Sequence, residues 1–513
     1  MTRTILLMLL SSLAGIQVPS VAAQEILNLS LQDAKGIALE NNRDIQIEKQ
    51  TVKISEGDIM TQKGIFDPIL NLSAYYLDAQ DPTTSTFITS GTINEKEFNA
   101  QSGITGTLPT GTFYNVLDFS VTRTTTNSPV DTLSPSWFTT LGFTVGQELL
   151  RNFGLDVNLA PVIVAKRSSK ISEKELETTI SDTFLNIETN YWLVIAAREN
   201  LKNQNTALEL ATDLQRRNEI QVEVGVLAPV SVTEAKSEVA ARQVDVINAE
   251  NTLRATEDAL KNTLAIPLTR QIYLTDKPTD VFKSFNESEV LKEALEQRPE
   301  IVQADLDVKN KETQKKFFSN QRLPSLSIQG TINLQGLGGN ENPNRIIFSD
   351  DPVQPISDLF DDSYRDSFRN LFNAEFPTWQ VLGVFSFPIF NWTARGNYVK
   401  ATADLDRSAI GYKKVTDDVT LDVRNAIREI ENSLKGIEAA KTSVGLSEEV
   451  VGNQGERLKV GIGTTRDVIE AQRDLVDART QLIRAIADYN IALARLERAK
   501  GTIIEASGVE IKE

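Results

Sequence analysis

The feature that most restricts the fold of this chain is a long-range duplication of its sequence. The segment KVGIGTTRDVIEAQRDL (459–475) resembles EVGVLAPVSVTEAKSEV (223–239), and the matching glycines lie 461 − 225 = 236 positions apart. Earlier in the two copies, Pro324 lies 324 − 68 = 256 positions after Pro68, so the first copy holds 256 − 236 = 20 additional residues. A repeat of this length indicates a duplicated domain, because solenoid units are only about 20–50 residues long.

Both copies predict the same order of elements: a helix, a strand hairpin, a long helix, a turn and a second long helix. The first helices are expected over 31–63 and 288–320, and each ends near a proline that begins a strand. We therefore divide the chain into five parts. These are a signal peptide (1–23), a first repeat (24–267), a connection (268–287), a second repeat (288–505) and a C-terminal tail (506–513).

The N-terminal residues have the pattern of a secretory signal. A basic Arg3 precedes a short apolar run, and Val21-Ala22-Ala23 has the small residues of a cleavage site. The apolar run is too short to cross a membrane as a helix. We therefore expect an exported protein.

The long helices show a heptad pattern. After the turn at Gly461, large apolar residues recur every seven positions, and alanine recurs on the same period from Ala471 to Ala499. The large residues are Val468, Leu475, Leu482, Tyr489 and Leu496. A strict heptad predicts left-handed supercoiling, and the alanines allow a neighbouring helix to approach closely. A plain antiparallel bundle would show the same period, so both arrangements remain open.

The predicted strands alternate between apolar and polar residues. In the second copy Leu326, Ile328 and Ile332 alternate with polar residues, as Leu70 and Leu72 do in the first. Such strands, about 9–11 residues long, cross a bilayer in a β-barrel, although a soluble sandwich gives the same alternation. The pattern predicts two hairpins, or four strands, per chain. These cannot close a barrel alone, so several chains must combine them.

Two segments between the predicted strands allow more than one interpretation. Residues 104–121 contain the turn Pro109-Thr110-Gly111, and whether they form an extra hairpin stays open. The second segment is acidic, and it suggests either a calcium site or a solvated extracellular loop. The loop is favoured because the spacing is not that of a calcium-binding loop. The acidic residues are Asp350, Asp351, Asp358, Asp361 and Asp362.

Composition argues against catalysis. The chain contains no cysteine and no histidine, so thiol nucleophiles, histidine bases and the usual metal ligands are missing. We expect no cofactor, no bound metal and no enzymatic activity. The formal net charge is −17 and no basic patch stands out, which argues against a nucleic-acid partner.

The duplicated turns predict helical hairpins. Gly461 and Gly463 permit a left-handed helix end, and Thr464-x-x-Asp467 has the pattern of a capping box for the next helix. In the first copy, Ser231-x-x-Glu234 is the expected counterpart, with Pro229 as a further break.

These turns, together with three further stretches, resemble the TolC-type outer-membrane efflux and secretion channels. The stretches are LSLQDAKGIALENNRDI (29–45), ETNYWLVIAARENL (188–201) and DVIEAQRDLVDA (467–478). The resemblance extends over about residues 29–500. It implies an α+β homotrimer in which hairpins of three chains form a twelve-stranded membrane β-barrel, continuous with a long periplasmic α-helical barrel. It also implies a passive exit duct for an inner-membrane pump, reached through a periplasmic adaptor protein.

The resemblance also assigns roles to residues of the turns. The adaptor-docking positions match Val224, Gly225, Val226, Val460, Gly461 and Ile462, and an acidic lumen gate matches Asp467 and Glu470. For Asp467, helix capping is the first interpretation, and a lumenal role is compatible with it. The Arg-Tyr-Asp network that closes some family members is missing, because the matching positions are Gly463, Leu458 and Ser231. The alternative function is a periplasmic coiled-coil scaffold without a pore.

Overall fold

The computed structural model describes residues 26–88, 90–281, 283–346 and 357–508, so the predicted signal peptide lies outside the described residues. The chain divides into two compact units. Of the described residues, the first unit contains those within 1–50, 174–301 and 415–513, and the second contains those within 51–173 and 302–414. Each unit takes segments from both copies of the repeat.

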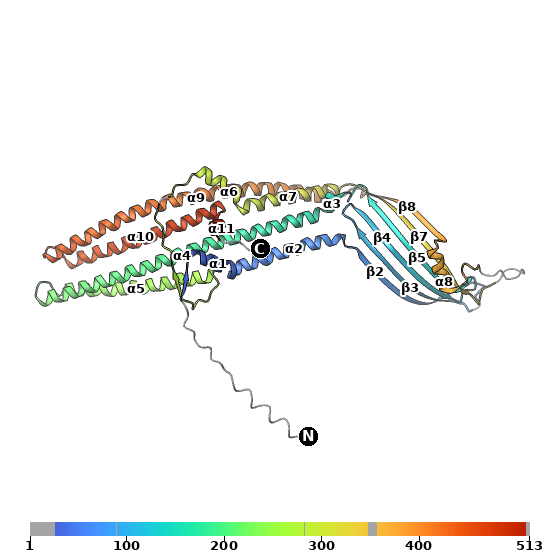
Figure 1. Ribbon diagram of the computed structural model, residues 1–513, viewed down its shortest axis with the longest axis horizontal. Helices are drawn as coiled ribbons and strands as arrows, with labels where there is room; N and C mark the ends of the chain where they lie inside the picture. Colours follow the sequence, from blue (N-terminus) through green and yellow to red (C-terminus); the bar gives the residue numbers. More distant parts are fainter. Residues whose placement is uncertain (1–25, 89, 282, 347–356, 509–513) are drawn as a thin grey trace, which may run out of the picture. The chain divides into compact units, whose positions relative to one another are not determined.

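The second unit contains one antiparallel sheet of six strands in the order β2-β3-β4-β5-β7-β8 (Figure 1). The expectation of four strands per chain was therefore wrong. Residues 92–126 form a complete hairpin that includes the segment 104–121 and turns at Gly111, where φ is 85°. The strands are β2 (Ile69–Pro82), β3 (Thr92–Thr107), β4 (Thr112–Thr126), β5 (Leu133–Glu148), β7 (Ser325–Glu341) and β8 (Phe376–Ser386).

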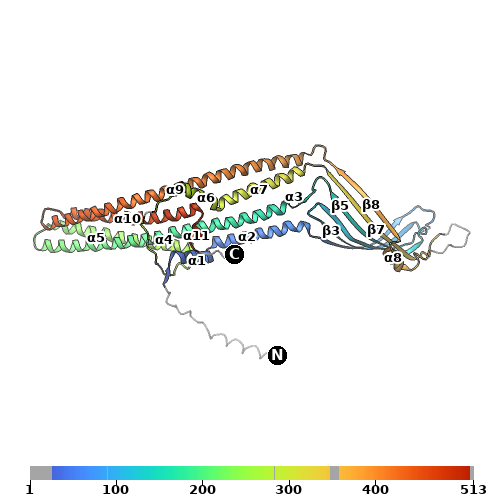
Figure 2. The ribbon, with the colours of Figure 1, turned by 45° about the horizontal axis from the view of Figure 1, so that its top comes forward.

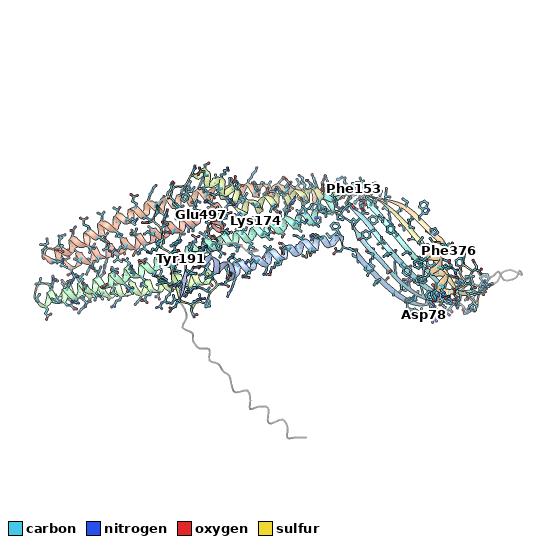
Figure 3. All side chains as sticks on the ribbon, in the orientation of Figure 1. Asp78, Phe153, Lys174, Tyr191, Phe376 and Glu497 are labelled. Carbon is cyan, nitrogen blue, oxygen red and sulfur yellow. The ribbon has the colours of Figure 1, made fainter. Side chains whose placement is uncertain are left out.

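The two copies use the connection between their outer strands differently. In the first copy this connection forms β3 and β4, whereas in the second it holds the helix α8 (Ser363–Phe372). Five of the strands have 14 to 17 residues, more than the 9–11 expected, and only β8, with 11, agrees. We call the end of the sheet where β2 connects to β3 and where β8 begins the loop end. Figure 3 shows Asp78 and Phe376 at this end and Phe153 at the opposite end.

The register of the strands separates apolar from polar side chains. One row across the sheet contains Leu72, Ser102, Phe119, Leu141, Leu334 and Pro377. The neighbouring residue on each strand from β2 to β7, which follows on β2, β4 and β7 and precedes on β3 and β5, gives the adjacent row: Ser73, Gln101, Ser120, Thr140 and Gln335. Because successive side chains point to opposite faces, the sheet has one largely apolar and one largely polar face.

Polar residues on the second face bond to one another across the strands. Ser120 and Thr140 hydroxyls lie 2.7 Å apart, and Thr144 and Thr331 hydroxyls 3.1 Å apart. On the apolar face large side chains are exposed, among them Leu72, Phe143, Ile332, Trp379 and Val381. Among the described residues, no helix is both long and apolar enough to cross a membrane.

The predicted first helix of each copy is interrupted once. The segment 31–63 consists of α1 (Leu31–Asn41) and α2 (Arg43–Lys63), and Asn42 between them accepts a hydrogen bond from the Ile45 amide. In the second copy, α6 (Glu287–Gln297) and α7 (Pro299–Asn320) are separated by Arg298. The residue before a proline avoids the helical conformation, which explains this second break.

The long helices form the two predicted hairpins, which lie side by side in Figures 1 and 2. The first consists of α4 (Ala160–Glu223) and α5 (Val230–Thr263), and the second of α9 (Trp392–Lys459) and α10 (Thr465–Lys500). The heptad positions Val468, Leu475, Tyr489 and Leu496 are buried, and so are four of the five alanines. The short elements are β1 (Leu27–Leu29), η1 (Gly64–Phe66), α3 (Leu155–Asn158), β6 (Ile272–Leu274) and α11 (Ile503–Ala506).

In the first unit, the chain segment that connects the repeats joins the core. β6 pairs in parallel with β1, and Tyr191, fully buried beside them, donates to the Leu29 carbonyl at 2.9 Å and contacts Asp276 at 2.7 Å. Burial, together with the bond to Asp276, raises the pKa of Tyr191 to about 12. The aromatic pair Tyr191-Trp192 is thus a packing element, and Tyr191 is labelled in Figure 3.

Candidate functional site: the tips of the helical hairpins

Each hairpin turns through the same hydrogen-bonded helix end. In the first, Gly225 has a φ of 79°, its amide donates to Val222 O at 3.0 Å, and the Val226 amide donates to Gln221 O at 2.8 Å. This pair of bonds defines a Schellman motif, in which the left-handed residue closes the helix. No atom lies within 4 Å of a Cβ built on Gly225, so the constraint at this position is the backbone conformation and not space.

The second tip repeats this geometry. Gly461 has a φ of 78°, its amide donates to Leu458 O at 3.1 Å, and the Ile462 amide donates to Arg457 O at 3.0 Å. The two copies of the turn therefore share the same pair of hydrogen bonds as well as similar residues.

Four branched aliphatic side chains stand exposed beside the two glycines. Their exposed fractions lie between 68% and 70%, and they belong to Val224, Val226, Val460 and Ile462. Bare aliphatic groups at the end of a charged helical hairpin are a candidate contact surface for another protein. We call these four residues and the two glycines the tip surface.

Helix α10 begins with the predicted capping box. The Asp467 amide donates to Thr464 Oγ1 at 3.2 Å, and the Thr464 amide donates to Asp467 Oδ2 at 3.0 Å. These bonds to Thr464, backbone first, lower the pKa of Asp467. The carboxylate is therefore a structural cap in each single chain.

The expected counterpart in the first copy was wrong. Helix α5 begins at Val230 after Pro229, which is the N-cap and makes no side-chain capping bond. Ser231 lies inside the first turn, where its carbonyl accepts a bond of 3.2 Å from the Asn218 side chain. Proline brings its own helical φ, so it replaces the capping serine at the start of the helix.

Glu470 and Asp474 are exposed on α10, on the side opposite its buried residues Val468, Leu475 and Val476. They extend the row that begins at Asp467. The structure thus places Asp467 and Glu470, the residues predicted for the gate, on one face of α10, with Asp467 partly exposed and Glu470 exposed.

Two contacts tie the hairpins together near the tip. Asn218, which is fully buried on α4, donates to Thr465 Oγ1 on α10 at 3.1 Å. Beside it, Leu214 packs against Val468 and Ile469, with Leu458 partly buried on the same cluster. Leu458 is the position that matches one member of the Arg-Tyr-Asp network that closes some members of the family this sequence resembles. In this chain its side chain contributes to packing instead.

A buried carboxylate links the two hairpins between α5 and α10. Glu238 on α5 is 3% exposed, and it accepts hydrogen bonds from Arg242 Nε at 2.7 Å and from Arg473 Nε, on α10, at 3.0 Å. Burial raises the carboxyl pKa, but the bonds from Arg473 and Arg242 outweigh burial and leave the pKa of Glu238 below its usual value. We call Glu238, Arg242 and Arg473 the tip ion network.

Sequence reasoning missed this network. Arg473 lies in the duplicated stretch 459–475 and Glu238 in its counterpart 223–239, so both residues belong to segments that the sequence analysis compared. Their pairing depends on the rotation of two helices about their axes, which heptad spacing leaves undetermined. The available signal was a glutamate whose helical neighbours three residues away on either side, Ala235 and Ala241, are both alanine.

Comparison with known proteins identifies the relatives of this fold. The family described as "Outer membrane efflux protein" matches residues 112–265 and 290–502. The outer membrane protein TolC of Vibrio cholerae is 23% identical over 348 residues, which cover 68% of this chain and 74% of that protein.

Solved structures agree with this match. The Campylobacter jejuni CmeC outer membrane channel superposes with a TM-score of 0.65 at 16% identity, covering 92% of this chain and 86% of that chain. The outer membrane protein VceC of Vibrio cholerae gives a TM-score of 0.64 at 14% identity, covering 92% of this chain and 96% of that one.

Proposed function

Because the chain belongs to the outer membrane efflux protein family, we propose that three copies of it assemble into one passive exit duct. Membership makes the chain an outer-membrane efflux channel with a periplasmic helical portion, and not an enzyme. The resemblance stated from the sequence is confirmed, and the scaffold without a pore is excluded. The number of chains, the adaptor and the pump are the proposal.

The open sheet carries the proposal for assembly. β2 and β8 are its edges, and nearly every residue of both is exposed in the single chain. Unpaired backbone groups are not tolerated in lipid, so both edges need partners. Six strands alternate in direction, so β8 of one chain runs opposite to β2 of the next and the antiparallel pattern continues across the seam.

Three such sheets give a barrel of eighteen strands in place of the twelve that the family resemblance implied. Barrel diameter grows roughly linearly with strand number, so at equal tilt this barrel is about one and a half times as wide. The polar face of each sheet, with its linked threonine and serine hydroxyls, lines the interior, and the apolar face meets lipid.

Helix α5 supports the same assembly from the helical unit. Its heptad residues Val232, Val239 and Val246 are only half-buried, and Val244 and Ile247 are 55% and 56% exposed. An apolar surface on both sides of a helix is typical of a helical barrel, in which each helix packs against one neighbour on either side. A second chain supplies the missing neighbour.

The tip surface is proposed to dock a periplasmic adaptor protein that connects the channel to an inner-membrane pump. Each hairpin has an exposed aliphatic side chain at the matching position of its turn, Val226 in the first and Ile462 in the second. A trimer would therefore present six similar contact points to the adaptor. Asp467 and Glu470 are proposed to face the lumen there, where three copies create an acidic constriction that attracts cations. The pump supplies the energy, and the channel supplies a polar path.

The chain lends itself to a direct test, because it has no native cysteine. Val226→Cys and Ile462→Cys, carrying a photoreactive crosslinker, should capture the adaptor in intact cells. Ser443→Cys, exposed on α9 away from the tip, is the matched control and should capture little. Equal capture from all three positions, or none from the tip, would remove the docking assignment without affecting the channel itself.

A further inference from the structure

Helix α8 lies on the apolar face of the sheet at its loop end (Figures 1 and 2). It covers β7 and β5, and two glycines of β7 make room for it. A Cβ on Gly336 would collide with the Ser367 carbonyl, and one on Gly338 with the Ser363 carbonyl. Gly336 pairs with Thr139, which shares a face with Leu141 two residues along β5. The helix therefore sits on the face that carries the exposed aliphatic and aromatic side chains.

The side of α8 that meets the sheet is largely polar, although Leu371 is also fully buried and Phe368 contacts Phe119 of β4, with ring centroids 6.1 Å apart. Ser367 donates to Thr139 Oγ1 at 2.8 Å, and Asn370 donates to the Leu337 carbonyl at 3.0 Å. Asp366 accepts the Asp362 amide at 2.6 Å. Ser367, Asn370 and Asp366 are fully buried. Hydrogen bonds thus fix the helix in place.

The outward side of α8 is aromatic. Phe372 is 71% exposed and Tyr364 is 53% exposed. Phe368 stacks on Phe372, with ring centroids 6.4 Å apart, and Tyr364 meets Trp137 of β5 edge to face at 6.1 Å. The exposed side of α8 thus combines the rings of Tyr364 and Phe372 with the charged Arg365 and Arg369, a composition typical of a helix at a membrane interface.

The height of α8 on the sheet places these rings close to the upper edge of the apolar band that a barrel of this type presents to lipid. From Leu326, at the start of β7, to Gly336 there are 336 − 326 = 10 residue steps. At about 3.3 Å per residue and a tilt of about 45°, they rise roughly 23 Å, close to the ~25 Å apolar band of outer-membrane barrels. Aromatic residues concentrate at that boundary, where an apolar ring and a polar group are both satisfied.

We propose that α8 is an interfacial helix that embeds its aromatic side in the outer leaflet of the outer membrane. The occupant of the exposed aromatic surface is lipid at the boundary of head groups and acyl chains, continuous with the apolar face below it. Arg365 and Arg369 flank the rings, where cationic side chains suit the phosphates of lipid head groups. The inference depends on the outer-membrane location and the outward apolar face, and it holds whatever the number of chains.

A second copy of the chain is a poorer occupant. α8 covers β5 and β7, neither of which is an edge strand, so the seams between chains run elsewhere. The interior of the barrel is also a poorer location, because the polar rows of Ser120 and Thr140 lie on the opposite face.

Depth-dependent quenching tests this placement. Phe372→Cys, labelled with an environment-sensitive fluorophore, is reconstituted in phospholipid vesicles that contain nitroxide lipids labelled near the head group or deep in the acyl chain. We expect blue-shifted emission, several-fold stronger quenching by the shallow nitroxide than by the deep one, and little quenching by aqueous iodide. Ser120→Cys on the polar face is the matched control and should respond to iodide and hardly to either lipid.

Two results would overturn the proposal. One is a Phe372 label that iodide quenches and the nitroxide lipids do not. The other is a label that neither quencher reaches, which would show a protein contact. Tyr364→Cys repeats the measurement about two turns earlier if the first variant fails to assemble. Gly338→Leu should release α8 from the sheet and make the Phe372 label less sensitive to the shallow nitroxide.

Discussion

Glu238 shows how a single side chain can hold two helical hairpins together at their tips. Its carboxylate is buried between Arg242 and Arg473, so removing its charge leaves two guanidinium groups with a weaker partner. We expect Glu238→Gln to lower the free energy of unfolding of the helical unit by about 2 kcal/mol, since hydrogen bonds to charged groups contribute about 1.5–3 kcal/mol each. Thermal melting in mild detergent measures this loss.

Acid should remove the same contribution from the natural protein. The folded pKa of Glu238 lies below its usual value of 4.5, so its stabilisation is complete above about pH 4.5 and is lost as the pH falls through the folded pKa. The difference in melting temperature between the natural chain and Glu238→Gln should therefore shrink below that pH. Asp213→Asn, which breaks an exposed pair with Arg217, is the control and should change little. A difference that is constant with pH would contradict the assignment.

Asp467 and Glu470 should govern ion selectivity if they line the constriction. Replacing them with Asn and Gln removes six charges per trimer at nearly unchanged volume. In planar bilayers the double variant should lose most of its cation preference and its block by divalent cations. The start of α10 should weaken only slightly, because Thr464 still accepts the N3 amide.

The control for this variant is Asp488→Asn, an exposed carboxylate farther along α10. It should keep the natural selectivity. Unchanged selectivity in the double variant would mean that the two carboxylates face away from the lumen, and Asp467 would then act only as a helix cap.

For single residues, the sequence predicted features that depend on neighbouring positions and missed contacts between residues far apart in the chain. The capping box at Thr464 and Asp467 follows from a four-residue pattern, and the structure contains it. Ser231 failed as a cap because Pro229, two residues earlier, started the helix first. The pairing of Glu238 with Arg473 joins residues 235 positions apart and depends on packing that no short pattern encodes.

The two Schellman turns are the elements on which the proposed adaptor docking depends. In Gly225→Val and Gly461→Val, a branched residue must adopt a φ near 79° or 78°, which is strained for any residue with a Cβ. We expect efflux to fall sharply while membrane insertion is retained. Gly445→Val, at an exposed glycine inside α9 without a positive φ, is the control and should be tolerated. Normal efflux and normal adaptor crosslinking in both turn variants would contradict the docking role.

The hairpin of β3 and β4 should set the width of the barrel. β2 and β5 run in opposite directions, so removal of residues 92–126 lets them pair directly and leaves four strands per chain. Polymers added from the loop side of a planar bilayer should then be excluded at a smaller size than in the natural channel. An unchanged size limit in a variant that still inserts would show that β3 and β4 are not part of the wall.

Sequence predicted the type of most elements and their order. The heptads and the repeat gave the helical hairpins, and alternation gave β2, β5, β7 and β8. The hairpin of β3 and β4 stayed undecided because its residues are rich in threonine, serine and asparagine, so its alternation in hydrophobicity is weak. Its apolar side becomes clear only from the register, which aligns Phe98 and Ala100 with Tyr76 and Ala74.

At the scale of the whole molecule, the chain is incomplete by itself. Both edges of its sheet are unpaired within the described residues, and α5 leaves Val244 and Ile247 more than half exposed. In the proposed homotrimer, neighbouring copies would bury these surfaces, which would explain how a chain without disulfides keeps its fold outside the cytoplasm. We therefore expect no stable folded monomer.

The mass of the assembled particle tests this account most directly. Native mass spectrometry of the mature protein, extracted from the outer membrane in mild detergent, should give a single species of three chains that survives mild activation. Three sheets of six strands then form one closed wall. A well-folded monomer, or a stable particle of two or four chains, would contradict the central claim that this protein is a three-chain duct.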